Sequence, residues 1–322
     1  MKQFNNPILS ILEDKLPVHV KPVQYLMDTL GISKESAYRR MRNQIPFSFD
    51  EVALLCRDLH FSIDRVIGSS DTSTGVFFQI NQTDNNEDTI YNFFVNFTND
   101  LEFIVRDSRS EIMLAINRFP LWCMPIKSLQ KLDYCKRLYS KDKINVLHTF
   151  QDIEIPSKLN EQYGRTTRLM ELIPNLTVLI DNNVFQKIVD EIKYFYTIKF
   201  LTKDDVEVLQ KGALELLEYY TTVALTGKNR VGYNYQLYLS NLSVDANVCY
   251  YTSNKSEISE IWLYNDQKIH IENNPVINTL HKNWIQSQIK FASFITSSND
   301  IVQREFFQKT YSLINTLTEI YQ

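Results

Sequence analysis

The sequence predicts two folded parts: an all-α N-terminal domain of five short helices, and a mixed α+β C-terminal domain with long helices and an antiparallel β-meander. Three observations lead to this prediction. Over residues 1–68, apolar residues recur at helical spacing in short segments broken by Gly and Pro. Longer segments with the same period follow as far as Gly227, and beyond it the period changes to 2. We therefore expect domains at 1–68 and 89–322, joined by a polar linker at 69–88 with a short candidate strand at Val76–Ile80.

Charge is distributed unevenly along the 322 residues, whose formal net charge is −4. Residues 1–70 hold nine Lys and Arg against eight Asp and Glu, a balance of +1, which leaves −5 for the remainder. Between Gly31 and Ile45, four basic residues face one acidic residue. A weakly acidic molecule of this kind would contact a polyanion only through its locally basic segment. The alternative is a solvated helix face without a partner.

The cysteines and the N-terminus point to the cytoplasm. The four cysteines are widely scattered and form no CxxC pair, so we expect reduced and mostly buried thiols. Glu13 and Asp14 lie too early for a signal peptide, and no uncharged apolar run is long enough to span a membrane. We expect a cytoplasmic protein without membrane contact.

The first helices have recognisable starts and stops. Apolar residues from Ile8 to Leu16 predict a first helix that ends at Pro17. A second begins at Pro22 and ends before Gly31, whose positive φ suits a tight turn between helices. Ser33 is a good N-cap for the third helix, which we expect to stop at Pro46.

Two further helices complete the predicted N-terminal domain. Ser48 and Glu51 form a capping box that opens the fourth, and Ser62 caps a fifth that Gly68 closes. In the third helix Ala37 and Met41 share the inward face. The opposite face carries polar and aromatic side chains, namely Lys34, Glu35, Tyr38, Arg39 and Arg42.

The segment GISKESAYRRMRNQIPFSFDEVALLCRDLHFSIDRVIG resembles the Cro/C1-type, lambda-repressor-like (XRE) helix-turn-helix family, over roughly Pro22 to Gly68. Its most specific parts are the LGIS turn and the run around FSIDRVIG. Two positions depart from the family pattern. Met27 stands where a small residue is usual, and Arg40 where an apolar one is usual, with Met41 expected in the core.

The resemblance implies binding of double-stranded DNA, with the helix of about residues 33–42 in the major groove. The residues that it places near bases or phosphates are Ser33, Lys34, Glu35, Ser36, Tyr38, Arg39 and Arg42. Arg39 would pair with guanine, Glu35 would accept from cytosine, and Arg42 would contact phosphate. The family usually binds as twofold dimers, so we expect a homodimer. The alternative for each of these residues is that its side chain is exposed and has no role in binding.

Helical periodicity in the C-terminal part predicts helices at Thr89–Asp107, Leu129–Tyr139, Leu159–Leu172, Asn183–Leu201, Asp204–Leu225, Pro275–Ile295 and Asn299–Tyr321. Thr202 and Asp205 form a further capping box, and the two helices that flank it are a candidate dimer surface. Strands are expected in SEIMLAINRFP, VGYNYQLYLSN, ANVCYYTSN, SEIWLYN and QKIHIEN, the last four as a meander with a hairpin turn at 264–267.

This part resembles, more loosely, the C-terminal part of bacterial (Bacteroidetes-type) transcriptional regulators that join a Cro/C1-type module to a mixed α/β domain. The similar pieces are SEIMLAINRFPLWCMP and IWLYNDQKIHIENNPVINTL. The resemblance supports the architecture, and we expect this domain to serve for dimerisation or for sensing a small-molecule or protein effector.

Signatures of enzymes are missing from the sequence. It contains no GxSxG, HExxH or GxGxxG motif, and its five histidines show no metal-ligand spacing. His270 alternates along a predicted strand and is expected to be structural. We expect no enzymatic activity, no cofactor and no metal, and interpret the chain as a sequence-specific transcriptional regulator. The alternative is a protein-interaction adaptor whose helix-turn-helix is vestigial.

Overall fold

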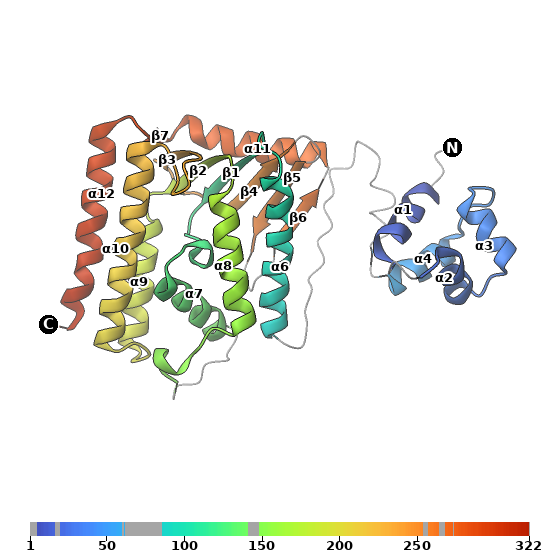
Figure 1. Ribbon diagram of the computed structural model, residues 1–322, viewed down its shortest axis with the longest axis horizontal. Helices are drawn as coiled ribbons and strands as arrows, with labels where there is room; N and C mark the ends of the chain where they lie inside the picture. The colour runs from blue at the N-terminus through green and yellow to red at the C-terminus, as the bar shows by residue number, and fades with distance from the viewer. Residues whose placement is uncertain are drawn as a thin grey trace. The chain divides into compact units, whose positions relative to one another are not determined.

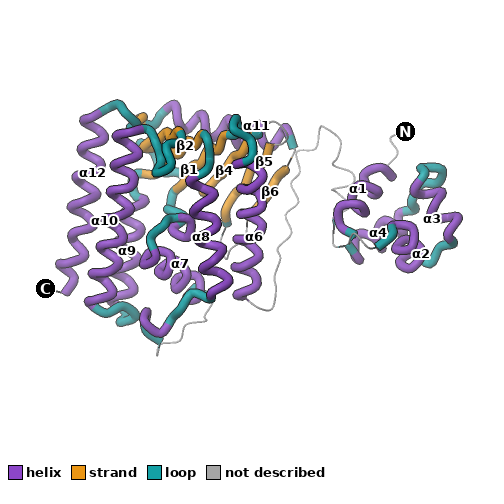
Figure 2. Tube along the Cα trace, in the orientation of Figure 1, coloured by secondary structure: helices purple, strands orange, loops and turns teal. Residues whose placement is uncertain are grey.

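The structure is a computed structural model that describes residues 5–16, 20–59, 61, 86–140, 148–253, 257–263, 268–272 and 274–321 (Figures 1 and 2). The chain divides into two compact units, Met1–Gln79 and Ile80–Gln322. Among the helices that the structure describes, none combines the length and the apolar character needed to cross a lipid bilayer.

The described part of the first unit is entirely helical. Its elements are α1 (Asn5–Lys15), α2 (Pro22–Leu30), α3 (Lys34–Met41) and α4 (Phe49–Asp58). Their apolar faces meet in one small core, in which Ile8, Leu12, Leu26, Ala37 and Leu55 are buried. The expected fifth helix after Ser62 and the candidate strand Val76–Ile80 lie outside the described residues.

Local signals position the helix boundaries of this unit. Gly31 adopts the left-handed conformation with φ of 63°, and its N–H bonds the carbonyl of Met27 to close α2. Ser33 caps α3 through the N–H of Ser36, and Ser48 forms the full capping box with Glu51. The expected stop of the third helix at Pro46 is wrong, because α3 already ends at Met41. The chain then turns through Asn43, whose φ is +56°.

The second unit combines seven described α-helices with a seven-stranded sheet. The helices are α6 (Asn86–Val105), α7 (Lys127–Tyr139), α8 (Ser157–Glu171), α9 (Val184–Thr197), α10 (Lys203–Thr226), α11 (Pro275–Lys290) and α12 (Asp300–Asn315), with short 3₁₀ turns at Leu121–Cys123, Phe150–Asp152 and Thr316–Tyr321. The predicted helices match them closely, and the Thr202–Asp205 capping box is confirmed. The helix expected at Pro275–Ile295 ends earlier, because Ser293 and Phe294 form an edge strand.

The sheet departs from the predicted meander. Its strands are β1 (Glu111–Ile116), β2 (Asn175–Asp181), β3 (Asn234–Ser240), β4 (Asn247–Thr252), β5 (Glu257–Trp262), β6 (Lys268–Glu272) and β7 (Ser293–Phe294), in the order β6-β5-β4-β1-β2-β3-β7. Strands β4, β5 and β6 form an antiparallel meander as expected, whereas β3 pairs in parallel with β2. The turn expected at 264–267 lies outside the described residues.

Strand β2 is a second strand that the prediction lacks, besides β7, and its absence explains the wrong pairing expected for β3. It is buried along nearly its whole length and lies between β1 and β3, parallel to both. Strands of a parallel sheet with both faces covered are apolar without alternation, so period 2 does not identify them. Parallel neighbours require long crossover connections, and here helices supply them.

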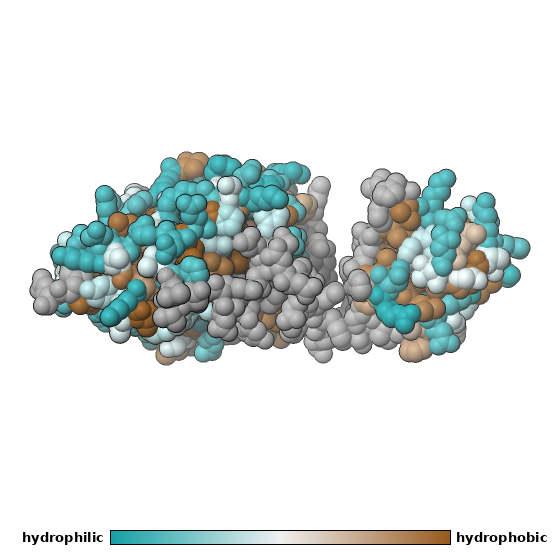
Figure 3. All heavy atoms as spheres, turned by 90° about the horizontal axis from the view of Figure 1, so that it is seen from below, coloured by the Kyte–Doolittle hydropathy of each residue, from teal (hydrophilic) through white to brown (hydrophobic). Residues whose placement is uncertain are grey.

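Helices cover the two faces of the sheet unequally. Figure 1 shows α11 running along one face alone, with α6, α8, α9, α10 and α12 side by side on the other. Side chains of β1 alternate accordingly: Ile112 and Leu114 join the large core, whereas Met113 and Ala115 pack with Ile285 of α11. The four cysteines are free thiols, three of them buried. The surface visible in Figure 3 is mostly hydrophilic, with smaller hydrophobic patches between.

Candidate nucleic-acid interface

Helix α3 is held in the first unit by its small inner face and by polar contacts at its ends. Ala37 is fully buried against the core, which brings the backbone of α3 close to its neighbours. The Asn43 amide N–H donates to the side-chain oxygen of Asn6 on α1, at 2.5 Å. The Tyr25 hydroxyl of α2 donates to Asp58 at the end of α4, also at 2.5 Å. The core and the Asn43–Asn6 bond therefore position α3 in this unit, and the Tyr25–Asp58 bond holds α2 to α4.

Arg40 provides the strongest of these contacts. Its Nη2 lies 2.6 Å from Glu51 Oε1 and its Nε lies 3.0 Å from Glu51 Oε2, a two-point contact between α3 and α4. Only 13% of the Arg40 side chain and 15% of the Glu51 side chain are exposed. Glu51 also accepts the Ser48 N–H in the capping box. Arg40 is thus accommodated by its pairing with Glu51, and it is turned away from the exposed face.

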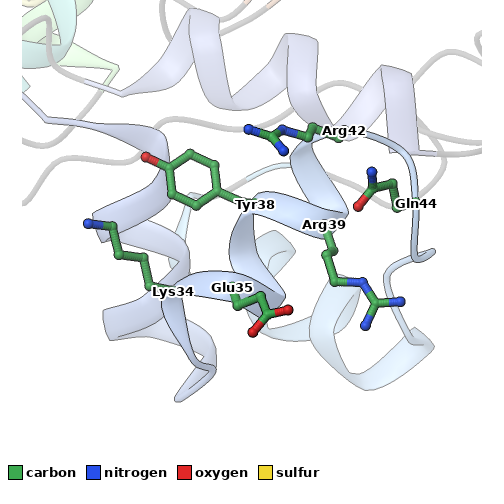
Figure 4. Close-up of a pocket in the computed structure, with 6 residues that line it drawn as sticks. All are labelled: Lys34, Glu35, Tyr38, Arg39, Arg42 and Gln44. Carbon is green, nitrogen blue, oxygen red and sulfur yellow. The ribbon is translucent and has the colours of Figure 1, made fainter.

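The opposite face of α3 is exposed and polar. The side chains that line it enclose an open hollow of about 570 Å³, and they are Lys34, Glu35, Tyr38, Arg39, Arg42 and Gln44. Figure 4 shows Lys34 and Tyr38 projecting to one side of the helix and Arg39 to the other, with Arg42 and Gln44 at its C-terminal end. All five residues that the sequence assigned to the outer face of this helix therefore come together.

Charge and contacts differ among these residues. Three cations face one carboxylate, so the exposed balance is +2 after Arg40 is withdrawn to Glu51. The Arg42 guanidinium lies 5.6 Å from the centre of the Tyr38 ring, a cation–π contact that orients both. Within the described part of the chain, the side chains of Lys34, Glu35 and Arg39 have no hydrogen-bond or ion-pair partner. They are free to engage an external one.

Two serines expected at the interface are used differently. The Ser33 hydroxyl accepts the Ser36 N–H and donates to the Ser36 hydroxyl, so it serves the helix cap. The Ser36 carbonyl accepts from Arg40. Neither serine lines the hollow. Gln44 does, and the sequence reasoning missed it because the backbone turn at Asn43 that brings it back beside Arg39 is not evident from helical spacing.

The second unit contains a smaller polar hollow of about 240 Å³ at the starts of β1, β2 and β3. Asn175, Thr177, Asn234 and Gln236 line it from neighbouring strands. Polar side chains are expected wherever a sheet surface faces water, and the hollow contains no further sign of a ligand.

One group of described side chains has the composition of a metal site, namely Asp100, Glu260 and His270. The Lys268 ammonium lies between the two carboxylates, in contact with both. The group therefore already contains its cation, and we assign no metal to it.

Searches of family models, of curated proteins and of solved structures find no match to this chain.

Proposed function

We propose that the chain binds double-stranded DNA in a sequence-specific way and regulates transcription, with α3 in the major groove. The observation that supports this most directly is the outer face of α3, where a carboxylate, a phenol, an amide and three cations surround one open hollow. The major groove admits one α-helix, and such side chains can read base edges or hold phosphates there. The largely buried Arg40–Glu51 pair keeps that face in a fixed orientation.

The roles of the residues follow from their positions. Arg39 has no internal partner within the described residues and carries the two-pronged donor that suits guanine O6 and N7. Glu35 lies one turn earlier and can accept from a cytosine amino group. Arg42 lies at the C-terminal end of α3, where its guanidinium is oriented by contact with the Tyr38 ring. We assign it to binding a DNA phosphate.

A homodimer is part of the proposal. The exposed face of α3 has a net charge of +2, so its binding would release few counterions from DNA. One copy would therefore bind weakly at physiological salt. Two copies related by a twofold axis would read two half-sites about 34 Å apart. The second unit then serves for dimerisation, for sensing an effector, or for both.

The test is site selection from genomic DNA fragments followed by gel shifts with the recovered site. Arg39→Ala is expected to weaken binding about 5-fold to 150-fold and to relax the preference at one base pair. Arg42→Ala should weaken binding to all sequences alike and lower the salt slope by about one. Arg57→Ala, an exposed arginine on α4 away from the hollow, is the matched control and should leave binding unchanged.

Recovery of one palindromic site would support the twofold dimer. Equal binding by wild type, Arg39→Ala and Arg42→Ala would contradict the assignment of α3. A chain that is not retained on a duplex column even at low salt would instead favour an adaptor that binds other proteins.

A further inference from the structure

A buried ionic cluster joins α6 to the β5–β6 hairpin of the second unit. At its centre is Glu260, whose side chain is fully buried. Its Oε2 accepts from the Tyr251 hydroxyl at 3.0 Å and from the Trp262 indole N–H at 3.1 Å. Its Oε1 contacts the Lys268 ammonium and lies 3.0 Å from His270 Nδ1. Both carboxylate oxygens are thus held in fixed directions, as an ionised group in the interior requires.

Asp100 extends this network to α6. Its Oδ2 lies 3.2 Å from Lys268 Nζ and 3.7 Å from His270 Nδ1. Through these two contacts Asp100 connects α6 to the charged residues of β6. The Lys268 ammonium also lies 5.9 Å from the ring centre of Phe93 and 5.6 Å from that of Phe97, both on α6. We call Asp100, Glu260, Lys268 and His270 the Glu260 cluster.

The charges of the Glu260 cluster do not balance without one further proton. Two carboxylates against one ammonium leave a net charge of −1, which a proton on His270 cancels. An uncompensated charge is costly where Lys268 is 11% exposed and Asp100 23% exposed. Among the residues that the structure describes, the other titratable groups that face the cluster are Cys249 and Tyr251 on β4.

The pKa shifts of these groups agree with one proton on His270. Burial raises the pKa of both Cys249 and Tyr251, so they remain neutral. Burial opposes ionisation of Glu260, but the charge of Lys268 and the bond to His270 lower the pKa of Glu260 to about 2. Burial disfavours a charged His270, yet the bond to Glu260 and the two carboxylate charges raise its pKa above the usual value. Burial also raises the pKa of Asp100, against the attraction of Lys268.

We propose that the Glu260 cluster is a proton-operated latch, in which protonated His270 holds Asp100, and with it α6, against the β5–β6 hairpin. The pH dependence of the latch follows from the linkage between proton binding and folding. Because the pKa of His270 is higher in the folded chain than in the unfolded one, the stabilisation is complete below the unfolded value near 6.5. It is lost as the pH rises through the folded value. The latch is therefore closed in mildly acidic solution and loosens on the alkaline side.

Two measurements on the full chain test the latch. The first is a pH titration of all five histidines by nitrogen-15 NMR, with His270→Gln used to identify the His270 signal. His270 should titrate above 6.5. In Asp100→Asn the remaining charges of Glu260 and Lys268 balance without a proton on His270, so its pKa should fall. A His270 pKa at or below 6.5, or one that Asp100→Asn leaves unchanged, would overturn the proposal.

The second measurement is amide hydrogen exchange in α6 and β6 from pH 6 to pH 8, corrected for the intrinsic rates. Protection in the wild type should fall about tenfold for each unit by which the folded pKa exceeds the unfolded one. Asp100→Asn should weaken this dependence while keeping the shape of the side chain, because only Glu260 then raises the pKa of His270. His281→Gln, a histidine on α11 in the opposite layer, is the control and should retain it.

Equal pH dependence in the wild type and Asp100→Asn would contradict the latch even if His270→Gln failed to fold. The last measurement repeats the hydrogen exchange with Zn²⁺ or Mn²⁺ added to the protein. Protection of α6 that rises with either ion would show that a metal, and not a proton, closes the cluster. No response to the ions is the expected result.

Discussion

Arg39 and Arg40 are adjacent in the sequence, yet their substitution should have opposite consequences. Arg40 contacts Glu51 at 2.6 and 3.0 Å and is largely buried, whereas Arg39 is exposed and lines the hollow. We expect Arg40→Met to destabilise the first unit and Arg39→Met to leave its stability unchanged. Methionine keeps most of the arginine stem in each case, so the comparison isolates the guanidinium.

The size of the Arg40 effect follows from its burial. Removing one partner of a fully buried pair costs about 3–5 kcal/mol, and breaking a surface pair costs about 0–1 kcal/mol. The side chains of Arg40 and Glu51 are 13% and 15% exposed, and Glu51 retains the Ser48 N–H after the substitution. We therefore expect a loss of about 2 kcal/mol, or roughly a 30-fold change in the unfolding equilibrium. For Arg39→Met the expected change is within about 0.5 kcal/mol.

Hydrogen exchange with mass spectrometry on the full chain can measure both effects. Peptides from α3 and α4 should lose about 30-fold of their protection in Arg40→Met, while those from α10 should not change. Adding Glu51→Gln to Arg40→Met should cost less than the sum of the two single changes, because the pair is already broken. Equal protection in Arg40→Met and the wild type, or equal losses in Arg39→Met and Arg40→Met, would refute the assignment of the two arginines.

Three further substitutions test the framework around the site. Gly31→Ala should destabilise the first unit by about 1 kcal/mol because the φ of Gly31 is 63°, in the left-handed region, although no neighbouring atom lies within 4 Å of the new Cβ. Hydrogen exchange in α2 would measure this loss, and an unchanged exchange rate would contradict it. Ser48→Ala should cost about 1 kcal/mol through loss of the capping box, seen as faster exchange confined to the first turn of α4. Gly212→Ala should lower the thermal midpoint of the second unit through a loss of about 1–3 kcal/mol, because its Cβ would clash with the Ser128 hydroxyl and lie 3.1 Å from the Ile126 side chain. An unchanged midpoint would show that α7 can move aside.

Local signals allowed much of the first unit to be predicted, because each depends on residues a few positions apart. The turn at Gly31, the cap at Ser33 and the box at Ser48 and Glu51 were all found in this way. The outer face of α3 follows from helical spacing alone. The Arg40–Glu51 pair does not, because it depends on how α3 crosses α4.

The second unit shows where such reasoning fails. Alternation of apolar and polar residues identifies β3, β4, β5 and β6 as strands, but it does not show which strands are neighbours in the sheet. The predicted pairing of β3 with β4 is therefore wrong. The Glu260 cluster joins Asp100 to a hairpin far along the chain, and only the packing of α6 on the sheet brings them together. The place of His270 in a strand predicts a structural role, and it gives no indication of the charged partners.

The strand order also has a consequence for folding during synthesis. Strand β1 lies between β2 and β4, so the ribosome must complete β2, β3 and β4 before the second neighbour of β1 exists. At about 5–20 residues per second, on the order of ten seconds or more separate the emergence of β1 from that of β4. The helices α1 to α4 depend on nearby residues and can fold in that interval. A nascent chain should thus contain a folded first unit well before its second unit has a complete sheet, with one edge of β1 exposed to chaperones meanwhile.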